Sequence, residues 1–230
     1  MTAICIPIVS SNDDELILDI KEIQSLPYDW IEWRIDCVED MDCIFSMAQI
    51  IRQSFSCPLI ATIRTQEQGG KWAQGKDEYI SLYQQLVLKK LVDCIDLESH
   101  IATAELVEWF HVQGVSIIFS DHRFDRGVNK KDIDALYERC LHVHADVLKI
   151  ASMPETSKEM VDQLLAMYDI SLQNQVKVIC IGMSKAGKIS RVIGGLFGSI
   201  LTFASANKKS APNQIGAREL KRYLQCIDEA

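Results

Sequence analysis

The stretch ADVLKIASMPETSKEMVDQLLAMY, residues 145–168, decides the fold. Its first seven residues are rich in Val, Leu and Ile, which is typical of a strand buried on both faces. Residues 157–168 instead repeat their apolar side chains at helical spacing. The stretch therefore predicts one buried strand followed by one helix.

The same alternation continues on both sides of this stretch, with apolar runs at intervals of about 30 residues. Eight strands are predicted, at residues 3–9, 30–35, 58–64, 92–98, 114–120, 145–151, 176–182 and 199–205. Eight strand–helix units favour a (β/α)8 barrel, a fold that takes about 250 residues and sometimes only about 200. We expect a single catalytic domain over residues 1–230, with an open doubly wound sheet as the alternative.

Composition and charge restrict the classes of partner. The 230 residues are 48% hydrophobic and 24% charged, and 24 basic against 32 acidic residues give a net charge of -8. This acidic balance argues against nucleic acid or an anionic membrane, since either would need a basic face. A small anionic ligand remains compatible, provided that a few Arg or Lys side chains converge locally.

The chain shows no targeting or membrane signal. Its first residues lack the basic flank and long apolar region of a signal peptide. The longest weakly polar stretch, residues 192–206, is interrupted by glycines and is shorter than the roughly 18 to 20 residues of a membrane helix. We expect a cytoplasmic protein without a membrane span.

Eight cysteines are dispersed along the chain without a CxxC pair. In a large domain this distribution predicts reduced thiols rather than a disulfide framework. Because no His, Cys or carboxylate cluster has metal-ligand spacing, we expect no metal.

The stretch WIEWRID, residues 30–36, has one charged face. Glu32, Arg34 and Asp36 share one parity, whereas Ile31 and Trp33 belong to the other. The pattern fits a half-exposed antiparallel strand, or a barrel strand whose charges point inward. Since buried charges are costly unless they are paired, the second interpretation predicts a polar ligand site.

Lys149 lies inside an apolar strand, which is unusual for a lysine. One interpretation is a side chain that packs its stem and extends its ammonium into water. The other is a desolvated amine, whose pKa burial lowers from its ordinary value of about 10.4. Such an amine is a candidate nucleophile toward a ketone.

His122 follows the fifth predicted strand and is the histidine best placed for proton transfer. Neighbouring strand ends of a barrel would bring it close to Lys149. His142 and His144 precede the sixth strand at the opposite rim, so we expect them on the surface.

The segment IGMSKAGKISR, residues 181–191, resembles a phosphate loop but places Ile189 where magnesium binding needs Ser or Thr. A nucleotide-binding P-loop is therefore not expected. A simpler anion site after the seventh strand, supported by Arg191, is one interpretation, and a flexible connecting loop is the other.

Taken together, these motifs resemble type I 3-dehydroquinate dehydratase over most of the chain. The resemblance depends on an ordered set: EWRID from Glu32, IRT with a following glycine pair around Arg64, SDHRF from residue 120, DVLKIA from residue 146, ISR from residue 189, FGSILTFA from residue 197 and SAPNQ from residue 210. The combination is far more specific than any one motif.

The resemblance implies a lyase of the shikimate pathway that converts 3-dehydroquinate to 3-dehydroshikimate without a metal or organic cofactor. Lys149 matches the lysine that forms a Schiff base with the substrate ketone. His122 matches the histidine that removes the neighbouring proton and protonates the departing hydroxyl. The resemblance also implies a homodimer.

The same resemblance assigns residues to the substrate. Three of them, Glu32, Arg34 and Arg64, match positions around the hydroxyl groups. The contacts to the carboxylate and a further hydroxyl match Arg191, Ser210 and Gln214, and the pocket lining matches Met183 and Phe203.

Three positions depart from the family pattern. Gln68 stands where a glutamate usually orients the catalytic histidine, and it cannot stabilise an imidazolium by charge. Glu67, Asp96 and Glu98 are alternative sources of a compensating charge. Pro7 replaces a frequent serine, and Asn213 replaces a frequent glycine, which fits if the backbone there has positive φ.

Two alternatives remain beside the dehydratase. A class I aldolase or transaldolase acting on a sugar phosphate would use the same lysine and the anion site. A catalytically dead binding barrel is the other, because Gln68 lacks the charge of the family glutamate.

Overall fold

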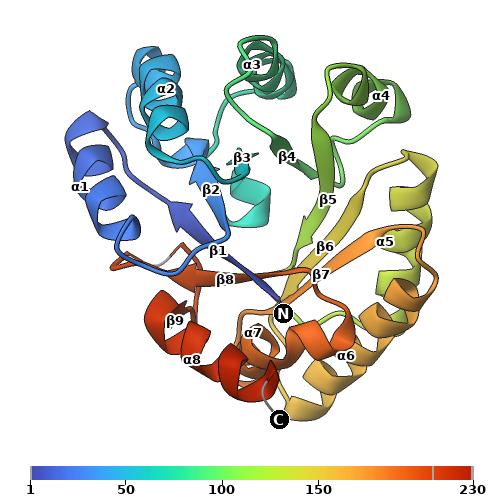
Figure 1. The fold of residues 1–230 in the computed structure, drawn as a ribbon. Helices are drawn as coiled ribbons and strands as arrows, with labels where there is room; N and C mark the ends of the chain where they lie inside the picture. The colour runs from blue at the N-terminus through green and yellow to red at the C-terminus, as the bar shows by residue number, and fades with distance from the viewer. Residues whose placement is uncertain (1, 209, 229–230) are drawn as a thin grey trace.

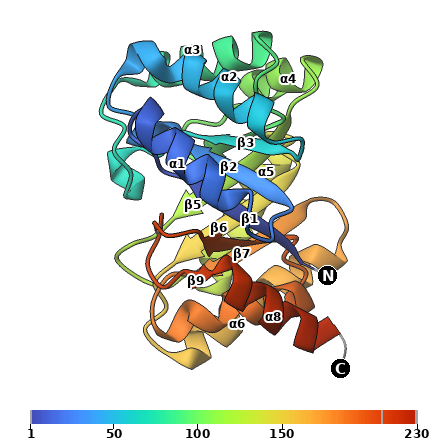
Figure 2. The same ribbon diagram turned by 60° about the vertical axis from the view of Figure 1, so that its left-hand side comes forward.

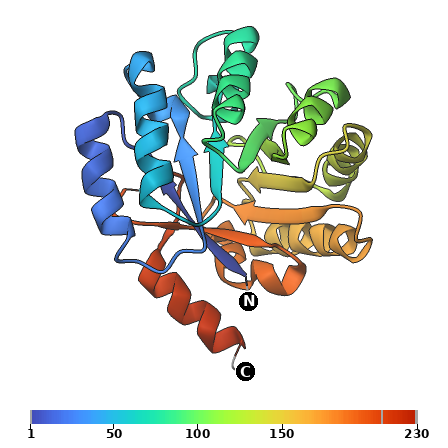
Figure 3. The ribbon, with the colours of Figure 1, turned by 45° about the horizontal axis from the view of Figure 1, so that its top comes forward.

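The alternating strands and helices wind into a closed ring in the computed structural model, which describes residues 2–208 and 210–228 (Figure 1). Parallel strands line the centre and helices form the outer layer, as the view in Figure 3 shows. The fold is the predicted (β/α)8 barrel. The alternative of an open doubly wound sheet is wrong, because the first and last barrel strands meet.

The strands occur in the predicted order. Their bounds are β1 Ala3–Ile8, β2 Trp30–Arg34, β3 Leu59–Thr62, β4 Cys94–Glu98, β5 Ser116–His122, β6 Val147–Ser152, β7 Lys177–Gly182 and β8 Leu201–Ser205. A two-residue strand, β9 (Ile215–Gly216), extends the sheet beside β8. The neighbours pair in parallel from β7 through β1 to β8, as the barrel requires.

Helices follow the strands and cover the outside of the sheet. Their bounds are α1 Asp13–Ile23, α2 Ile44–Ser54, α3 Lys76–Leu88, α4 Ala104–Val112, α5 Lys130–His142, α6 Ser157–Leu172, α7 Ser190–Ile193 and α8 Ala217–Asp228. Side-chain caps begin several of them: Thr156 accepts from the Glu159 amide at α6, and Asn129 forms a capping box with Asp132 at α5. Figure 2 shows this outer layer from the side.

The inside of the barrel changes from apolar to polar along the strands. Inward positions alternate along each strand, because successive side chains point to opposite faces. From amino to carboxyl end these positions read Cys94, Asp96 and Glu98 on β4, Ile118, Ser120 and His122 on β5, and Val147, Lys149 and Ala151 on β6. The charges therefore lie in the carboxyl half, where barrel enzymes carry their sites.

The barrel closes between β7 and β8 through a short contact. Ile200 N donates to Val178 O at 2.9 Å, and Val178 bridges Ser199. Farther along β7 the backbone amides donate to side chains instead of to the backbone of β8: Cys180 N donates to Ser199 Oγ and Gly182 N to Ser190 Oγ. The carboxyl ends of β7 and β8 are thus separated by the segment that carries α7.

The structure refines several sequence-based boundaries. His122 is the last residue of β5 rather than a loop residue beyond it, and β2 ends at Arg34, so that Asp36 lies in the short helix η1 (Ile35–Cys37). His142 and His144 are exposed, as expected. The eight cysteines are free thiols. Among the described residues, no helix has the length and apolar character needed to cross a bilayer.

Candidate active site

A pocket opens at the carboxyl ends of the barrel strands. It contains every candidate site residue from the sequence: Glu32, Arg34, Arg64, Gln68, His122, Lys149, Met183, Arg191, Phe203, Ser210 and Gln214. Thr62, Gly69, Phe124, Ala151, Ile181 and Ala211 complete the lining. The barrel therefore brings together residues as far apart in the sequence as Glu32 and Gln214.

Lys149 extends from β6 into the barrel and is only 3% exposed. Its Nζ donates to Asp96 Oδ2 at 2.6 Å, lies 3.5 Å from Glu32 Oε1, and sits 4.4 Å from the centroid of the Phe203 ring. The solvent-exposed interpretation is therefore wrong. Burial of the amine is accompanied by a close carboxylate partner, Asp96, which no sequence motif assigned to Lys149.

Arg64 and Asp96 form the centre of a buried charge network. Arg64 donates to Asp96 Oδ1 at 2.7 Å and to Glu98 Oε1 at 2.9 Å, while Ser120 Oγ lies within hydrogen-bond distance of both Arg64 and Asp96. Burial alone would raise the pKa of Asp96, but Arg64 and Lys149 hold it well below its ordinary value. Although burial opposes its charge, Asp96 and Glu98 raise the pKa of Arg64.

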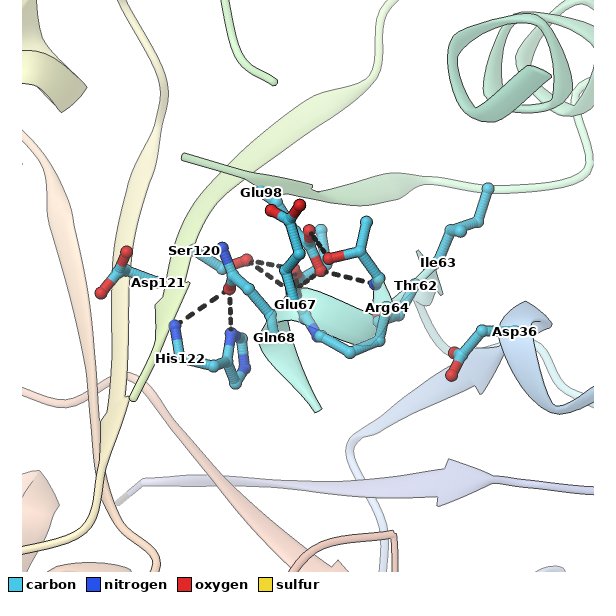
Figure 4. Close-up of polar contacts among 12 residues, drawn as sticks. Asp36, Thr62, Ile63, Arg64, Glu67, Gln68, Glu98, Ser120, Asp121 and His122 are labelled. Atoms are coloured by element: carbon cyan, nitrogen blue, oxygen red, sulfur yellow. Dashed lines mark hydrogen bonds and ion pairs between the residues drawn. The ribbon is translucent and has the colours of Figure 1, made fainter. Parts of the chain in front are cut away.

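His122 is oriented by Gln68, which belongs to the short helix η3 (Gln66–Gln68). Gln68 Oε1 accepts from the backbone amide of His122 at 3.0 Å and lies 3.0 Å from His122 Nδ1 (Figure 4). Because a backbone amide can only donate, the oxygen of Gln68 must face His122. Nδ1 must then carry the proton, which leaves Nε2 of the neutral imidazole as the proton acceptor.

The surroundings of His122 favour the neutral ring. Desolvation, followed by the positive charges of Arg64 and Lys149, holds the pKa of His122 well below its ordinary value, and Asp96 offsets this only in part. Gln68 contributes no charge. His122 is therefore an unprotonated base at neutral pH.

Of the alternatives for compensating charge, Asp96 is the one that acts electrostatically on His122. Glu98 accepts from Arg64 and from Thr65, and Glu67 is exposed. Within residues 2–208 and 210–228, Gln68 is the side chain that hydrogen-bonds to the His122 ring.

The two charged positions on β2 differ in their partners. Glu32 accepts from Thr62 Oγ1 at 3.0 Å and faces Lys149, so the inward orientation predicted for this strand is confirmed. Arg34 makes a bidentate pair with Asp36, with both N–O distances at 2.9 Å. Asp36 is thus a partner of Arg34 within a structural ion pair.

Arg191 is a buried cation whose partners are neutral. It is 2% exposed, and its terminal nitrogens donate to the carbonyls of Phe203 at 3.1 Å and Pro212 at 3.0 Å. Its buried Nε has no hydrogen-bond partner among the described residues. Desolvation lowers the pKa of Arg191 to about 10. A buried guanidinium with only carbonyl partners is suited to receive an anion.

The loop after β8 brings Ser210 and Gln214 to the same side of the pocket. The two side chains bond to each other, with Gln214 Nε2 at 2.9 Å from Ser210 Oγ. Asn213 has φ 54°, which confirms the positive φ expected there, and its side chain donates to the carbonyl of Met183 at 2.7 Å. This bond ties the loop to the end of β7.

Sequence reasoning missed the pairing of Asp96 with Lys149 and the bridging role of Ser120. The alternation that placed Glu32 inside the barrel applies equally to CIDLE on β4, where Cys94, Asp96 and Glu98 share one parity. That signal would have found Asp96. The same parity argument applies to Thr62, which alternates with Ile60 and Arg64, whereas Phe124 lies beyond β5 and carries no such signal.

No group of three or more His, Cys, Asp or Glu side chains suited to a metal ion occurs in the described part of the chain. The chemistry that the pocket offers is a buried amine, a neutral imidazole and a buried guanidinium without a carboxylate partner among the residues that the structure describes. Fold and pocket together define a (β/α)8-barrel enzyme with a buried lysine in its site.

The chain belongs to the type I 3-dehydroquinase family, whose model matches residues 4–230. The 3-dehydroquinate dehydratase of Bacillus licheniformis is 36% identical over 97% of this chain and 91% of that protein. The 3-dehydroquinate dehydratase of Enterococcus faecalis is 31% identical over 98% of this chain and 92% of its own length.

Solved structures agree with this assignment. The type I 3-dehydroquinate dehydratase of Clostridium difficile, crystallised with covalently modified comenic acid, has a TM-score of 0.92 at 31% identity, over 99% of this chain and 93% of that one. The 3-dehydroquinate dehydratase of Geobacillus kaustophilus has a TM-score of 0.94 at 26% identity, over 100% and 92%.

Proposed function

We propose that this protein dehydrates 3-dehydroquinate to 3-dehydroshikimate through a Schiff base on Lys149. The observation that supports this most directly is the placement of Lys149, His122 and Arg191 in one pocket at the strand ends. Membership of the type I 3-dehydroquinase family supplies the substrate and the reaction. The aldolase alternative has no such support.

The proposed chemistry begins with attack of the Lys149 amine on the substrate ketone. Loss of water gives an imine, which withdraws electrons and acidifies the adjacent carbon. His122 Nε2 removes a proton from that carbon, and the electrons form an enamine. Collapse of the enamine expels the β-hydroxyl, which takes a proton from His122 and leaves as water. Hydrolysis of the imine then releases the product and restores Lys149.

The buried charges keep the amine in place for this step. Asp96 binds Lys149 Nζ and is itself fixed by Arg64 and Ser120. The side chain of a lysine has four rotatable bonds, so its terminal nitrogen needs such an anchor to reach one geometry. Lys149 must lose a proton before it attacks, and the neutral His122 is the pocket base suited to accept it.

Arg191 is proposed to bind the substrate carboxylate, with Ser210 and Gln214 beside it. Glu32, Arg34 and Arg64 are proposed to surround the substrate hydroxyl groups, while Met183 and Phe203 supply apolar walls. Because Arg191 has no carboxylate partner among the described residues, an incoming carboxylate would be its first opposite charge.

A turnover assay tests the proposal and separates it from the catalytically dead barrel. We expect the purified protein to convert 3-dehydroquinate, with the conjugated product followed by its ultraviolet absorbance. Tight binding of 3-dehydroquinate by calorimetry without any product would instead support a binding barrel and overturn the proposed function.

Exchange of Gln68 for glutamate should shift the acid limb of the activity profile. A carboxylate beside His122 Nδ1 stabilises the imidazolium, which raises the pKa of His122 from its lowered value. Since His122 must be neutral to accept a proton, Gln68→Glu moves the acid limb of kcat/KM upward by roughly 1 to 2 pH units. The measurement is kcat/KM as a function of pH for both proteins.

Gln66→Glu is the matched control for this exchange, because it introduces the same charge at an exposed position of the same short helix. Its profile should overlay that of the unaltered protein. Coincident acid limbs for Gln68→Glu and the unaltered protein would contradict the assignment of Gln68 as the partner of the catalytic histidine.

Exchange of Arg191 for methionine should weaken substrate binding. Loss of a charge-assisted hydrogen bond to a carboxylate should raise KM by roughly 10- to 100-fold, with a smaller effect on kcat. Steady-state kinetics measure both parameters. Lys188→Met, which removes an exposed charge from the same segment, should leave KM unchanged. An unaltered KM in Arg191→Met would rule out the carboxylate contact.

We also propose a single catalytic domain over residues 1–230, a cytoplasmic location and a homodimer. Exposed apolar side chains at helical spacing on α6, namely Val161, Leu165, Tyr168 and Leu172, give a face on which a second copy could pack. The acidic composition is consistent with a soluble biosynthetic enzyme that acts on a small anionic substrate.

A further inference from the structure

Gln68 has a second partner, the imidazole of His100, which follows β4. Gln68 Nε2 lies 3.3 Å from His100 Nδ1. The amide of Gln68 therefore bridges two histidines: its oxygen faces His122 inside the pocket, and its nitrogen faces His100 outside it. The His100 side chain is 42% exposed and does not line the pocket.

The protonation of His100 follows from this bridge. The oxygen of Gln68 is held toward His122 by the His122 backbone amide, which can only donate. The Nε2 group of Gln68 is consequently a donor toward His100. A hydrogen bond to His100 requires Nδ1 of that ring to be unprotonated, because two donors repel each other.

We propose that His100 is a positioning residue for the dehydration: its unprotonated Nδ1 accepts from Gln68 and thereby fixes the amide that fixes His122. This inference rests on the proposed function. An amide, unlike a carboxylate, has two unlike ends and needs a partner for each. A glutamate at position 68 could accept from His122 through either oxygen and would need no acceptor at position 100.

Two carboxylates flank the His100 ring. Glu98 Oε2 lies 3.7 Å from Nδ1, and Glu67 Oε2 lies 3.9 Å from Nε2. Glu98 is already bonded to Arg64 and to both donors of Thr65. Both carboxylates lie beyond hydrogen-bond distance of the ring, whereas Gln68 Nε2 lies within it and supplies the donor that an unprotonated Nδ1 requires.

The decisive substitution is His100→Phe, which keeps an aromatic ring and removes the acceptor. We expect kcat to fall by roughly fivefold to tenfold, the equivalent of one lost hydrogen bond, with KM nearly unchanged. His100→Asn, which can present an amide oxygen near the position of Nδ1, should recover most of the loss. His142→Phe, at an exposed position at the other end of the barrel, is the control and should have no effect.

A double-mutant cycle distinguishes positioning from a general structural role. In the Gln68→Glu background the acceptor is no longer needed, so adding His100→Phe should change kcat by less than about twofold. Rates are compared at about pH 8.5, above the acid limb of either parent. An equal loss in both backgrounds, or no loss in either, would overturn the inference.

Nitrogen-15 NMR of the histidine rings supplies a readout that needs no substrate. The unaltered protein should show His122 protonated at Nδ1 and His100 unprotonated at Nδ1. His100→Phe should give a mixture of His122 tautomers, and an unchanged His122 spectrum would contradict the proposal. Failure of the proposed function would appear separately, as absent turnover in the unaltered protein.

Discussion

Replacement of Lys149 by methionine is expected to abolish turnover and covalent trapping together. Methionine matches the length of the lysine stem but offers no amine, so the imine cannot form. The fall in kcat should be at least about 10⁴-fold, since removal of a nucleophile eliminates the covalent pathway. Incubation with 3-dehydroquinate and borohydride, followed by mass spectrometry, should locate a reduced adduct on Lys149 in the unaltered protein only.

The matched control is Lys177→Met, which removes an exposed lysine from the amino end of the neighbouring strand β7. It should retain both turnover and the adduct on Lys149. Turnover that survives in Lys149→Met, or an adduct on a different lysine, would remove the proposed mechanism. Urea unfolding of each variant shows whether the loss is chemical or reflects an unfolded barrel.

Replacement of Arg64 by methionine is expected to give the largest loss of stability. Arg64 is the common partner of Asp96 and Glu98, both of which are fully buried. Removal of one member of a buried ion-pair network leaves uncompensated charge, and the free energy of unfolding should fall by about 3 to 5 kcal/mol at neutral pH. Equilibrium unfolding in urea measures this difference.

The effect should depend on pH in a defined direction. In the unaltered protein the pKa of Asp96 is lowered, so its contribution to stability is fully present above the unfolded pKa and is lost only in strong acid. In Arg64→Met the folded-state pKa of Asp96 should rise above its unfolded value, because the cation that lowers it most is gone. The variant then gains stability relative to the unaltered protein as the pH falls from about 8 to about 5.

Lys130→Met provides the comparison for Arg64, because Lys130 pairs with Asp134 at 3.0 Å on the exposed face of α5. Its removal should leave stability unchanged within error, since exposed pairs contribute little. A loss for Arg64→Met that is small and does not vary with pH would show that the network is not maintained by this arginine.

The fold was predictable because the strand signal is repeated eight times. Each run such as VKVICIG is short, apolar and followed by a helical period, and the order of elements follows directly. The ends of the strands were less predictable, because hydrogen-bond pairing with neighbours rather than composition decides where a strand stops. His122 belongs to β5 because its backbone pairs with that of Ala151 on β6.

The residues that line the pocket were easier to predict from the sequence than the ion pairs and hydrogen bonds between them. Motifs place residues at strand ends, and a barrel gathers strand ends, so the candidate set converges on one pocket. The ion pair of Lys149 with Asp96 connects β6 to β4 across the barrel interior. No local sequence pattern predicts a contact between residues so far apart in the chain. The Gln68–His100 contact likewise joins η3 to the turn after β4, between residues that are 32 positions apart.

The incomplete ladder between β7 and β8 accounts for the position of Arg191. If β7 and β8 were hydrogen-bonded along their whole length, the Phe203 carbonyl would accept from a β7 amide. No room would then remain for the Arg191 guanidinium between the two strands. Instead, the hydroxyl groups of Ser199 and Ser190 accept from the β7 amides, and Arg191 donates to the Phe203 carbonyl of β8. Extending the β7–β8 ladder by design would therefore remove the hydrogen-bond partner that holds Arg191, so this part of the scaffold is the one least open to such stabilisation.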